Sequence, residues 1–163
     1  MGCGKSTLGR RLARRLGVPF VDTDARIEER EGATVSDVFR YEGEARFREV
    51  EREVLDEAIA GHESAVVSTG GGLPVWGDNM ERMNGTGCTV YLRRSAENIA
   101  GRLSPYGRRK RPRLSGLNDE ELVAFMTQDM AARDPFYSRA QLVAECDGLS
   151  DDEIVEWILS RNR

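Results

Sequence analysis

The sequence predicts an α/β domain of three layers, in which helices cover both faces of a parallel β-sheet. Short apolar runs alternate with longer amphipathic segments along the 163 residues, and this alternation is typical of strand–helix–strand units. The run 65–68 is continuously small and apolar, as in a strand buried on both faces. Residues Gly4-Lys5-Ser6 begin a helical pattern and match the end of a phosphate-binding loop. The length suits one domain.

The first half of the chain contains the clearest helical patterns. Leucines at helical spacing predict a helix over 4–16, followed by a short strand over 20–22 and a helix over 24–31. Ser36 is expected to cap a further helical turn. An apolar stripe with charges on the opposite face predicts a longer helix over 47–60.

The second half repeats the alternation around one irregular segment. Residues 104–117 are polar, contain two prolines and carry the basic run from Arg108 to Arg113, so we expect a mobile lid loop there. Ser150 and Glu153 form a capping box that opens the last helix. In chain order, we expect a helix over 78–84, a strand over 88–92, a helix over 95–103, a helix over 118–132, a strand over 142–144 and a helix from Ser150.

The phosphate-loop pattern G-x-x-x-x-G-K-[ST] is present only at its right-hand end. Its first glycine and the strand that normally leads into the loop would fall before Met1. We therefore expect a five-stranded sheet whose first strand is missing from this chain, with an internal methionine taken as the start. Without that strand its neighbours would expose unpaired backbone groups, and we expect weak or absent ATP turnover by the chain as written.

Composition narrows the classes of function. The net charge is −4, which gives no indication of general nucleic-acid binding. Only two of the 24 basic residues are lysines, Lys5 and Lys110. A chain that otherwise uses arginine has a lysine at the phosphate-loop position, where a compact charge suits a phosphate, and this supports the motif. The three cysteines lack C-x-x-C spacing and indicate neither a disulfide framework nor a zinc site, as in a cytoplasmic protein. No apolar run could cross a membrane.

Two groups of residues near strand ends are candidates for phosphate chemistry. Lys5, Ser6 and Thr7 suit phosphate and Mg²⁺, because the lysine reaches phosphate and a hydroxyl can ligate the metal. Asp22 and Asp24 are two apart at a strand end, so both carboxylates are expected to point the same way. One could activate an attacking hydroxyl while the other holds the water shell of the metal. Alternatively, Asp24 only caps the next helix.

Arginines and glycines supply the remaining candidates. Arg48 either lies solvated on apolar surface or grips a carboxylate with its planar guanidinium. Arg133 lies at a helix end, where a cation is also expected from the helix dipole. The basic run 108–113 fits a lid that brings arginine to a phosphoryl group better than a nucleic-acid patch, because aromatic platforms are lacking apart from Tyr106. Gly70-Gly71-Gly72 would let backbone approach a ligand closely.

Taken in order, these motifs resemble the shikimate kinase family, a P-loop fold related to nucleoside monophosphate kinases. They span nearly the whole chain, and the resemblance implies one P-loop kinase domain over 1–163 with its lid at about 104–117. The matching segments are Gly4-Lys5-Ser6-Thr7, Phe20-Val21-Asp22-Thr23-Asp24, Glu44-Ala45-Arg46-Phe47-Arg48-Glu49-Val50-Glu51, Ser68-Thr69-Gly70-Gly71-Gly72, Arg111-Pro112 and Arg133-Asp134-Pro135-Phe136-Tyr137.

The resemblance implies transfer of the ATP γ-phosphoryl group to the 3-hydroxyl of shikimate, in the pathway to chorismate and the aromatic amino acids. Asp24 would hold and activate that hydroxyl. Arg48 and Arg133 would bind the substrate carboxylate, and Gly71 would offer its backbone to the ring hydroxyls. Arg102 resembles the arginine that stacks on adenine.

The same resemblance assigns the nucleotide and metal ligands. Lys5 and the lid residue Arg111 would stabilise charge on the transferring phosphoryl group. Ser6 would ligate Mg²⁺, with Asp22 helping through water. The residues Gly2, Gly4 and Thr7 would complete the ATP site.

Two other functions stay open. The first is a related small-molecule kinase such as a gluconate kinase, although the paired arginines and the triple glycine favour shikimate. The second is an inactive shikimate-kinase-like protein that binds a ligand without turnover. The expected partner is a small molecule, with neither nucleic acid nor membrane involved, and we expect a monomer.

Overall fold

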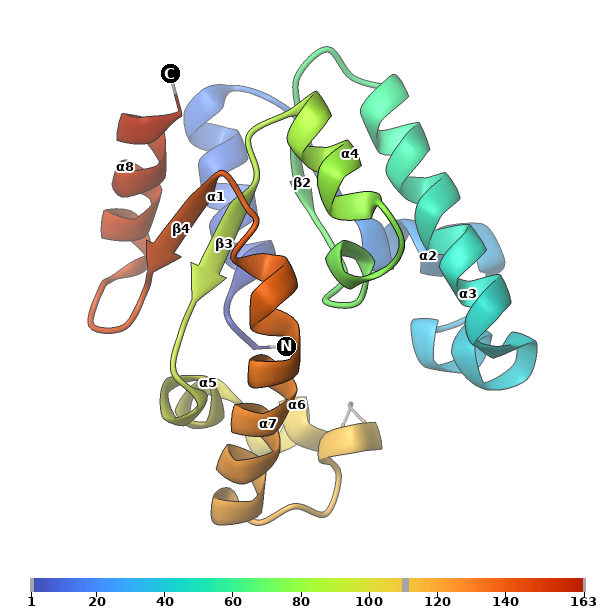
Figure 1. The fold of residues 1–163 in the computed structure, drawn as a ribbon, viewed down its shortest axis with the longest axis vertical. Helices are drawn as coiled ribbons and strands as arrows, with labels where there is room; N and C mark the ends of the chain where they lie inside the picture. The colour runs from blue at the N-terminus through green and yellow to red at the C-terminus, as the bar shows by residue number, and fades with distance from the viewer. Residues whose placement is uncertain (1, 110–111, 163) are drawn as a thin grey trace. The chain divides into compact units, whose positions relative to one another are not determined.

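The computed structural model describes residues 2–109 and 112–162, which fall into two compact units. We call residues 5–88 the N-terminal unit, and residues 2–4 together with 89–162 the C-terminal unit. Each unit contains one parallel ladder of two strands with helices beside it (Figure 1). The helices and strands therefore alternate along the chain as the sequence predicts.

The ladder of the N-terminal unit lies next to its first helix. Strand β1 (Phe20–Asp22) pairs in parallel with β2 (Val66–Ser68), and Asp22 is level with Ser68. Helix α1 (Lys5–Leu16) contacts both strands. The carboxyl ends of β1 and β2 therefore lie at one edge, where ligands bind in parallel sheets.

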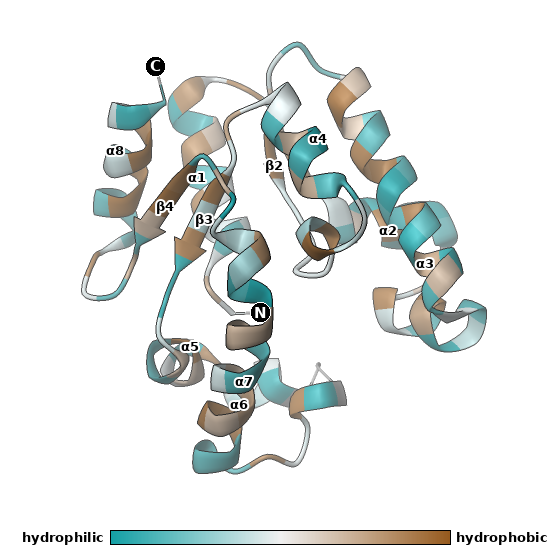
Figure 2. Ribbon diagram, in the orientation of Figure 1, coloured by the Kyte–Doolittle hydropathy of each residue, from teal (hydrophilic) through white to brown (hydrophobic). Residues whose placement is uncertain are grey.

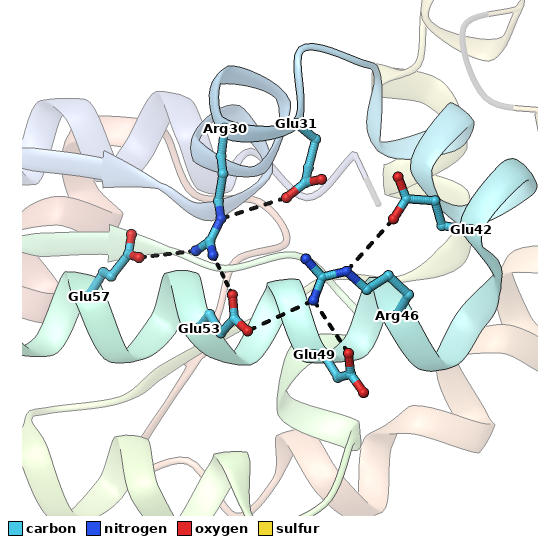
Figure 3. Close-up of polar contacts among 7 residues, drawn as sticks. All are labelled: Arg30, Glu31, Glu42, Arg46, Glu49, Glu53 and Glu57. Atoms are coloured by element: carbon cyan, nitrogen blue, oxygen red, sulfur yellow. Dashed lines mark hydrogen bonds and ion pairs between the residues drawn. The ribbon is translucent and has the colours of Figure 1, made fainter.

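Helices α2 (Thr23–Glu31) and α3 (Val35–Ala60) pack against each other through a buried apolar cluster that contains Ile27 and Val50. An ion-pair network covers the solvent side of this contact (Figure 3). Apart from Glu31, its side chains are exposed, and an exposed pair stabilises by less than about 1 kcal/mol, so the apolar cluster supplies most of the packing energy. The paired residues are Arg30 with Glu31, Glu53 and Glu57, and Arg46 with Glu42, Glu49 and Glu53.

Helix α3 is longer than the apolar stripe predicts. Thr34 caps it by accepting a hydrogen bond from the Asp37 backbone N–H at 3.1 Å, so the expected cap at Ser36 is wrong. Gly43 has φ 84° and ψ 168°, which kinks the element and separates its short first segment from the amphipathic remainder. After β2 come a 3₁₀ turn, η1 (Leu73–Val75), and α4 (Asn79–Thr86).

The C-terminal unit contains the second ladder. Strand β3 (Val90–Arg93) pairs in parallel with β4 (Leu142–Glu145), and both strands are predominantly hydrophobic (Figure 2). Helix α8 (Asp151–Arg161) packs on β4 and begins at the predicted capping box. Helices α5 (Ala96–Arg102) and α7 (Asp119–Tyr137) pack together over a buried cluster.

Two predictions for this unit need correction. The helix expected over 118–132 is longer than predicted, because α7 continues through Pro135 to Tyr137. Pro135 removes one hydrogen bond of the helix, which ends two residues later at Tyr137. The segment expected to be a lid loop also contains short turns, α6 (Pro105–Arg109) and η2 (Pro112–Leu114). Leu114 is fully buried and anchors the second of them.

The four strands pair in parallel, as predicted, but form two ladders and not one sheet within the described ranges. The strand expected before the phosphate loop is not part of the 163 residues. Among the helices that the structure describes, none is long and apolar enough to span a membrane.

Candidate active site

The phosphate-loop residues adopt a backbone that requires glycine. Gly2 has φ 72° and Gly4 has φ 94°, a left-handed region that other residues rarely adopt. Lys5 is the first residue of α1, whose free N-terminal N–H groups and dipole favour an anion. Ser6 and Thr7 follow in the first turn. The local backbone thus has the features that anion binding needs.

Asp22 joins the phosphate loop to α2. Its Oδ2 accepts a hydrogen bond from the Ser6 hydroxyl at 2.7 Å, and its Oδ1 accepts one from the Asp24 backbone N–H at 3.2 Å. Asp22 is therefore the cap of α2, and the alternative that Asp24 caps this helix is wrong. The strand-spacing argument is also wrong, since β1 ends at Asp22 and Asp24 lies in the first helical turn. The two carboxylates are neighbours through this turn.

The surroundings of Asp24 favour its protonated form more than water does. Desolvation by the protein around it raises the pKa of this carboxyl above its usual value, and the neighbouring Asp22 carboxylate raises it further. Lys5 acts in the opposite direction. A carboxylate with a raised pKa is a better proton acceptor, which suits a general base.

Gly70 leaves room for two carboxylates. Its N–H donates to the hydroxyl of the buried Thr23 at 2.9 Å, which fixes the turn after β2 to the start of α2. A methyl group at Gly70 would lie 2.6 Å from Asp24 Oδ1 and 3.0 Å from Glu51 Oε1. Glycine is needed here because both side chains occupy the space where a Cβ would be.

Arg48 is held by its own helix and by aromatic rings. Its Nη1 donates to Glu51 Oε2 at 2.5 Å, and its Nη2 donates to the exposed Glu44 at 3.3 Å. The guanidinium lies 5.3 Å from the Phe47 ring centroid and 5.6 Å from that of Trp76. Only 16% of the Arg48 side chain is exposed. The arginine is thus oriented before any substrate arrives.

Gly72 provides the space for this guanidinium. Its φ of −85° and ψ of −24° are open to every residue, so backbone freedom does not explain the glycine. A Cβ there would overlap the Arg48 guanidinium, lying 2.9 Å from Nη2 and 3.1 Å from Cζ. Gly71, to which the family resemblance assigns contacts with the substrate, lies between Gly70 and Gly72 and is partly exposed.

Glu51 is a site residue that the sequence reasoning missed. It is only 2% exposed, lies beside Asp24 at Gly70 and bonds Arg48. Burial raises the pKa of its carboxyl, while the hydrogen bond and charge of Arg48 lower it. The available signal was its position three residues after Arg48 and next to Val50 of the apolar stripe. A glutamate at such a position needs a partner for its charge.

The C-terminal unit holds the other predicted arginines. Arg133 pairs with Asp129 at 3.2 Å, and the same carboxylate oxygen lies 3.4 Å from Arg113 in the lid segment. Arg102 is 40% exposed and lies 3.5 Å from Asp151. Arg111 lies outside the described residues.

Arg108 of the basic run is anchored within the same unit. Its guanidinium pairs with Asp119 and donates to the backbone carbonyls of Leu103 and Ala100. Arg108 therefore fastens the segment that we expect to be a lid to the end of α5.

The structure thus brings Lys5, Ser6 and Thr7 together with both aspartates, Arg48 and the triple glycine within the N-terminal unit, whereas Gly2 and Gly4 belong to the C-terminal unit. The sequence pattern of the shikimate kinase family matches residues 1–163. The chain is 46% identical over 161 residues to a shikimate kinase of Bacteroides thetaiotaomicron, covering 99% of this chain and 91% of the relative.

Solved structures agree with the sequence matches. A crystal structure of shikimate kinase from Bacteroides thetaiotaomicron superposes with a TM-score of 0.87 at 46% identity, covering 99% of this chain and 90% of the other. A shikimate kinase from Acinetobacter baumannii in complex with shikimate gives 0.83 at 33% identity, covering 99% and 87%. These neighbours confirm the predicted α/β P-loop kinase fold. The chain belongs to the shikimate kinase family.

Proposed function

We propose that this chain transfers the γ-phosphoryl group of ATP to the 3-hydroxyl of shikimate, giving ADP and shikimate 3-phosphate. The observation that carries the proposal is the arrangement around Gly70 and Gly72. There a carboxylate with a raised pKa, Asp24, lies beside the pair formed by Glu51 and Arg48. A proton acceptor next to a carboxylate-binding arginine suits a hydroxy acid.

The acid group of the substrate would bind Arg48. Nη1 is held by the buried Glu51, whereas Nη2 bonds Glu44, whose side chain is 54% exposed. An exposed ion pair contributes less than about 1 kcal/mol, so an incoming carboxylate can replace Glu44 at little cost. Glu51 would keep the guanidinium in place during this exchange. Arg133 would be the second arginine for the same carboxylate.

The chemical step would begin at the substrate hydroxyl. Asp24 would accept the proton of the 3-hydroxyl while the oxygen of that hydroxyl forms a bond to the γ-phosphorus. At the same time the bond from the γ-phosphorus to the bridging oxygen of ADP would break. Gly71 would offer its backbone to the ring hydroxyls. Catalysis would come mainly from positioning and from stabilising charge on the phosphoryl oxygens.

The nucleotide phosphates would lie against the loop and the first turn of α1, with Lys5 supplying a point charge. Gly2, Gly4 and Thr7 would complete the cradle, and Arg102 would stack on adenine. The lid residue Arg111 would add a second positive charge to the transferring group. Residues 1–163 would act as one kinase domain with its lid at 104–117.

A magnesium ion fits the residues at Ser6. The hydroxyl and the Asp22 carboxylate are hard oxygen donors 2.7 Å apart, which is the ligand type that Mg²⁺ prefers. No cluster of three or more metal-binding side chains occurs in the described part of the chain, so phosphate and water would supply the other ligands. Bound Mg²⁺ would neutralise charge on the phosphate oxygens. Ser6 would ligate it, and Asp22 would hold its water shell and orient the Ser6 hydroxyl.

The proposal is tested by measuring ADP release with shikimate, gluconate and nucleoside monophosphates as acceptors. We expect release that depends on shikimate alone. Trp76 lies beside Arg48 and is 48% exposed, so its fluorescence in a Trp157→Phe background can report shikimate binding separately. Binding without ADP release would indicate the inactive binding protein, and release with gluconate alone would indicate the rival kinase.

A further inference from the structure

Arg94 is a buried cation directly after β3. Only 3% of it is exposed. Its Nε donates to the Cys3 carbonyl oxygen at 3.1 Å, and its Nη1 donates to the Cys146 carbonyl oxygen at 2.9 Å and to Asn98 Oδ1 at 3.3 Å. All three acceptors are neutral, so the partners shown for Arg94 do not cancel its charge.

The surroundings of Arg94 do not favour an arginine if only the stability of the folded state is considered. Arg94 Nη2 is buried and has no hydrogen-bond partner among the described residues. A buried charge without a carboxylate and an unmade buried hydrogen bond both destabilise the folded state, and an apolar side chain would avoid both. The hydrogen bonds that Arg94 makes to its neighbours therefore explain an arginine at this position better than a contribution to stability does. One of its partners, Cys3, belongs to the phosphate loop.

The bond to Cys3 fixes the direction of the next amide. In a trans peptide the C=O of one residue and the N–H of the following residue point in opposite directions, and the described peptide bonds are all trans. Because the Cys3 carbonyl points to Arg94, the Gly4 N–H points away from it. Backbone N–H groups of this loop are the donors that hold phosphate in such motifs.

The other side of Cys3 is fixed by packing on α5 and the residue after it. A Cβ on Gly2 would lie 3.1 Å from both Ile99 Cγ2 and Leu103 Cδ2, so this glycine sits close against both side chains. Cys3 itself packs against the apolar cluster that contains them. Residues 2 and 3 of the loop are thus held within the C-terminal unit, by packing at Gly2 and by the hydrogen bond from Arg94 to Cys3.

We propose that Arg94 is a positioning residue for the nucleotide. It fixes the Cys3 peptide so that the Gly4 N–H is oriented for a phosphate oxygen before ATP binds, and it places a positive charge behind the loop. The ligand class is a nucleoside diphosphate or triphosphate. The inference rests on the proposed function in one respect, namely that this loop binds the nucleotide.

The test compares wild type with Arg94→Met, Arg94→Lys and the control Arg161→Met. Arg161 is an exposed arginine of the same unit whose loss changes the net charge equally. Calorimetry gives the affinities for ADP and for shikimate. Arg94→Met is expected to weaken ADP binding about tenfold, the factor that corresponds to one charge-assisted hydrogen bond. Shikimate affinity and the control should stay unchanged.

The ADP affinity of Arg94→Lys should lie between those of wild type and Arg94→Met. Lysine keeps the positive charge but cannot donate to both carbonyl oxygens at once. In ¹⁵N-glycine-labelled protein the Gly4 amide resonance should move in Arg94→Met, and this readout does not depend on activity. Unchanged ADP affinity in Arg94→Met would overturn the inference, as would an equal loss for both ligands. If Arg94→Met does not fold, Arg94→Lys decides by the same criteria.

The two proposals fail separately. If wild type binds ADP but does not phosphorylate shikimate, the proposed function falls while the affinity comparison still tests Arg94. If shikimate is phosphorylated but ADP binds Arg94→Met normally, only the role of Arg94 falls.

Discussion

Replacing Gly72 with alanine is expected to weaken shikimate binding without affecting ATP. The backbone of Gly72 is already in a conformation that alanine adopts freely, so the substitution adds a methyl group and no strain in φ. That methyl overlaps the Arg48 guanidinium, which has to move. The movement breaks the 2.5 Å bond from Arg48 to the buried Glu51.

The size of the effect follows from that bond. A hydrogen bond between charged groups contributes about 1.5 to 3 kcal/mol, which corresponds to about 10- to 150-fold in affinity. The KM for shikimate at saturating ATP should rise by this factor. The dissociation constant from Trp76 fluorescence, in the Trp157→Phe background, should rise equally. The KM for ATP should stay within about twofold, since the three atoms nearest to the added methyl group all belong to Arg48.

Gly85→Ala is the matched control. Gly85 lies in α4 of the same unit, its φ is not positive, and a Cβ there meets no atom within 4 Å. This variant should keep both KM values. A normal shikimate KM in Gly72→Ala would refute the steric argument, and an equal rise of both KM values would refute the assignment of Arg48 to the acid substrate.

Three further outcomes are expected. Asp24→Asn should lower kcat at least about 100-fold while both substrates still bind, because a general base contributes about 10² to 10⁴; near-normal kcat would contradict its role. Wild-type kcat/KM should fall with decreasing pH through a pKa above the usual aspartate value, since only ionised Asp24 accepts a proton and its surroundings raise its pKa; a pH profile whose acid limb lies at or below that value would contradict this. Arg48→Ala should raise the shikimate KM with little change for ATP, and a matching loss of ATP affinity would rule out the clamp.

Local patterns predicted most of the elements because they depend on residues close in sequence. Strand β1 was predicted to the residue, and the capping box at Ser150 marks the start of α8. Predictions of helix ends were wrong where more than one local signal was present. Thr34 lies two residues before Ser36 and caps α3 in its place, and α7 continues for two residues beyond Pro135.

The candidate site was predictable as a set of residues but not as an arrangement. Asp24 and Arg48 were identified from motifs, yet their connection runs through Glu51, which approaches them only after α2, α3 and the turn after β2 have packed. The reason for Gly72 is likewise a tertiary contact, since nothing in its neighbours requires glycine. Arg94 reaches a loop carbonyl 91 positions away in the sequence. Such contacts leave no periodic signal.

The most direct test of the proposed activity is to identify the product. After incubation of the chain with ATP, Mg²⁺ and shikimate, ³¹P and proton NMR should show one new phosphate ester, coupled to the proton on carbon 3 of shikimate. The same mixture with Asp24→Asn should show none. A phosphate on another hydroxyl, or ADP formation with no phosphorylated shikimate, would contradict the account.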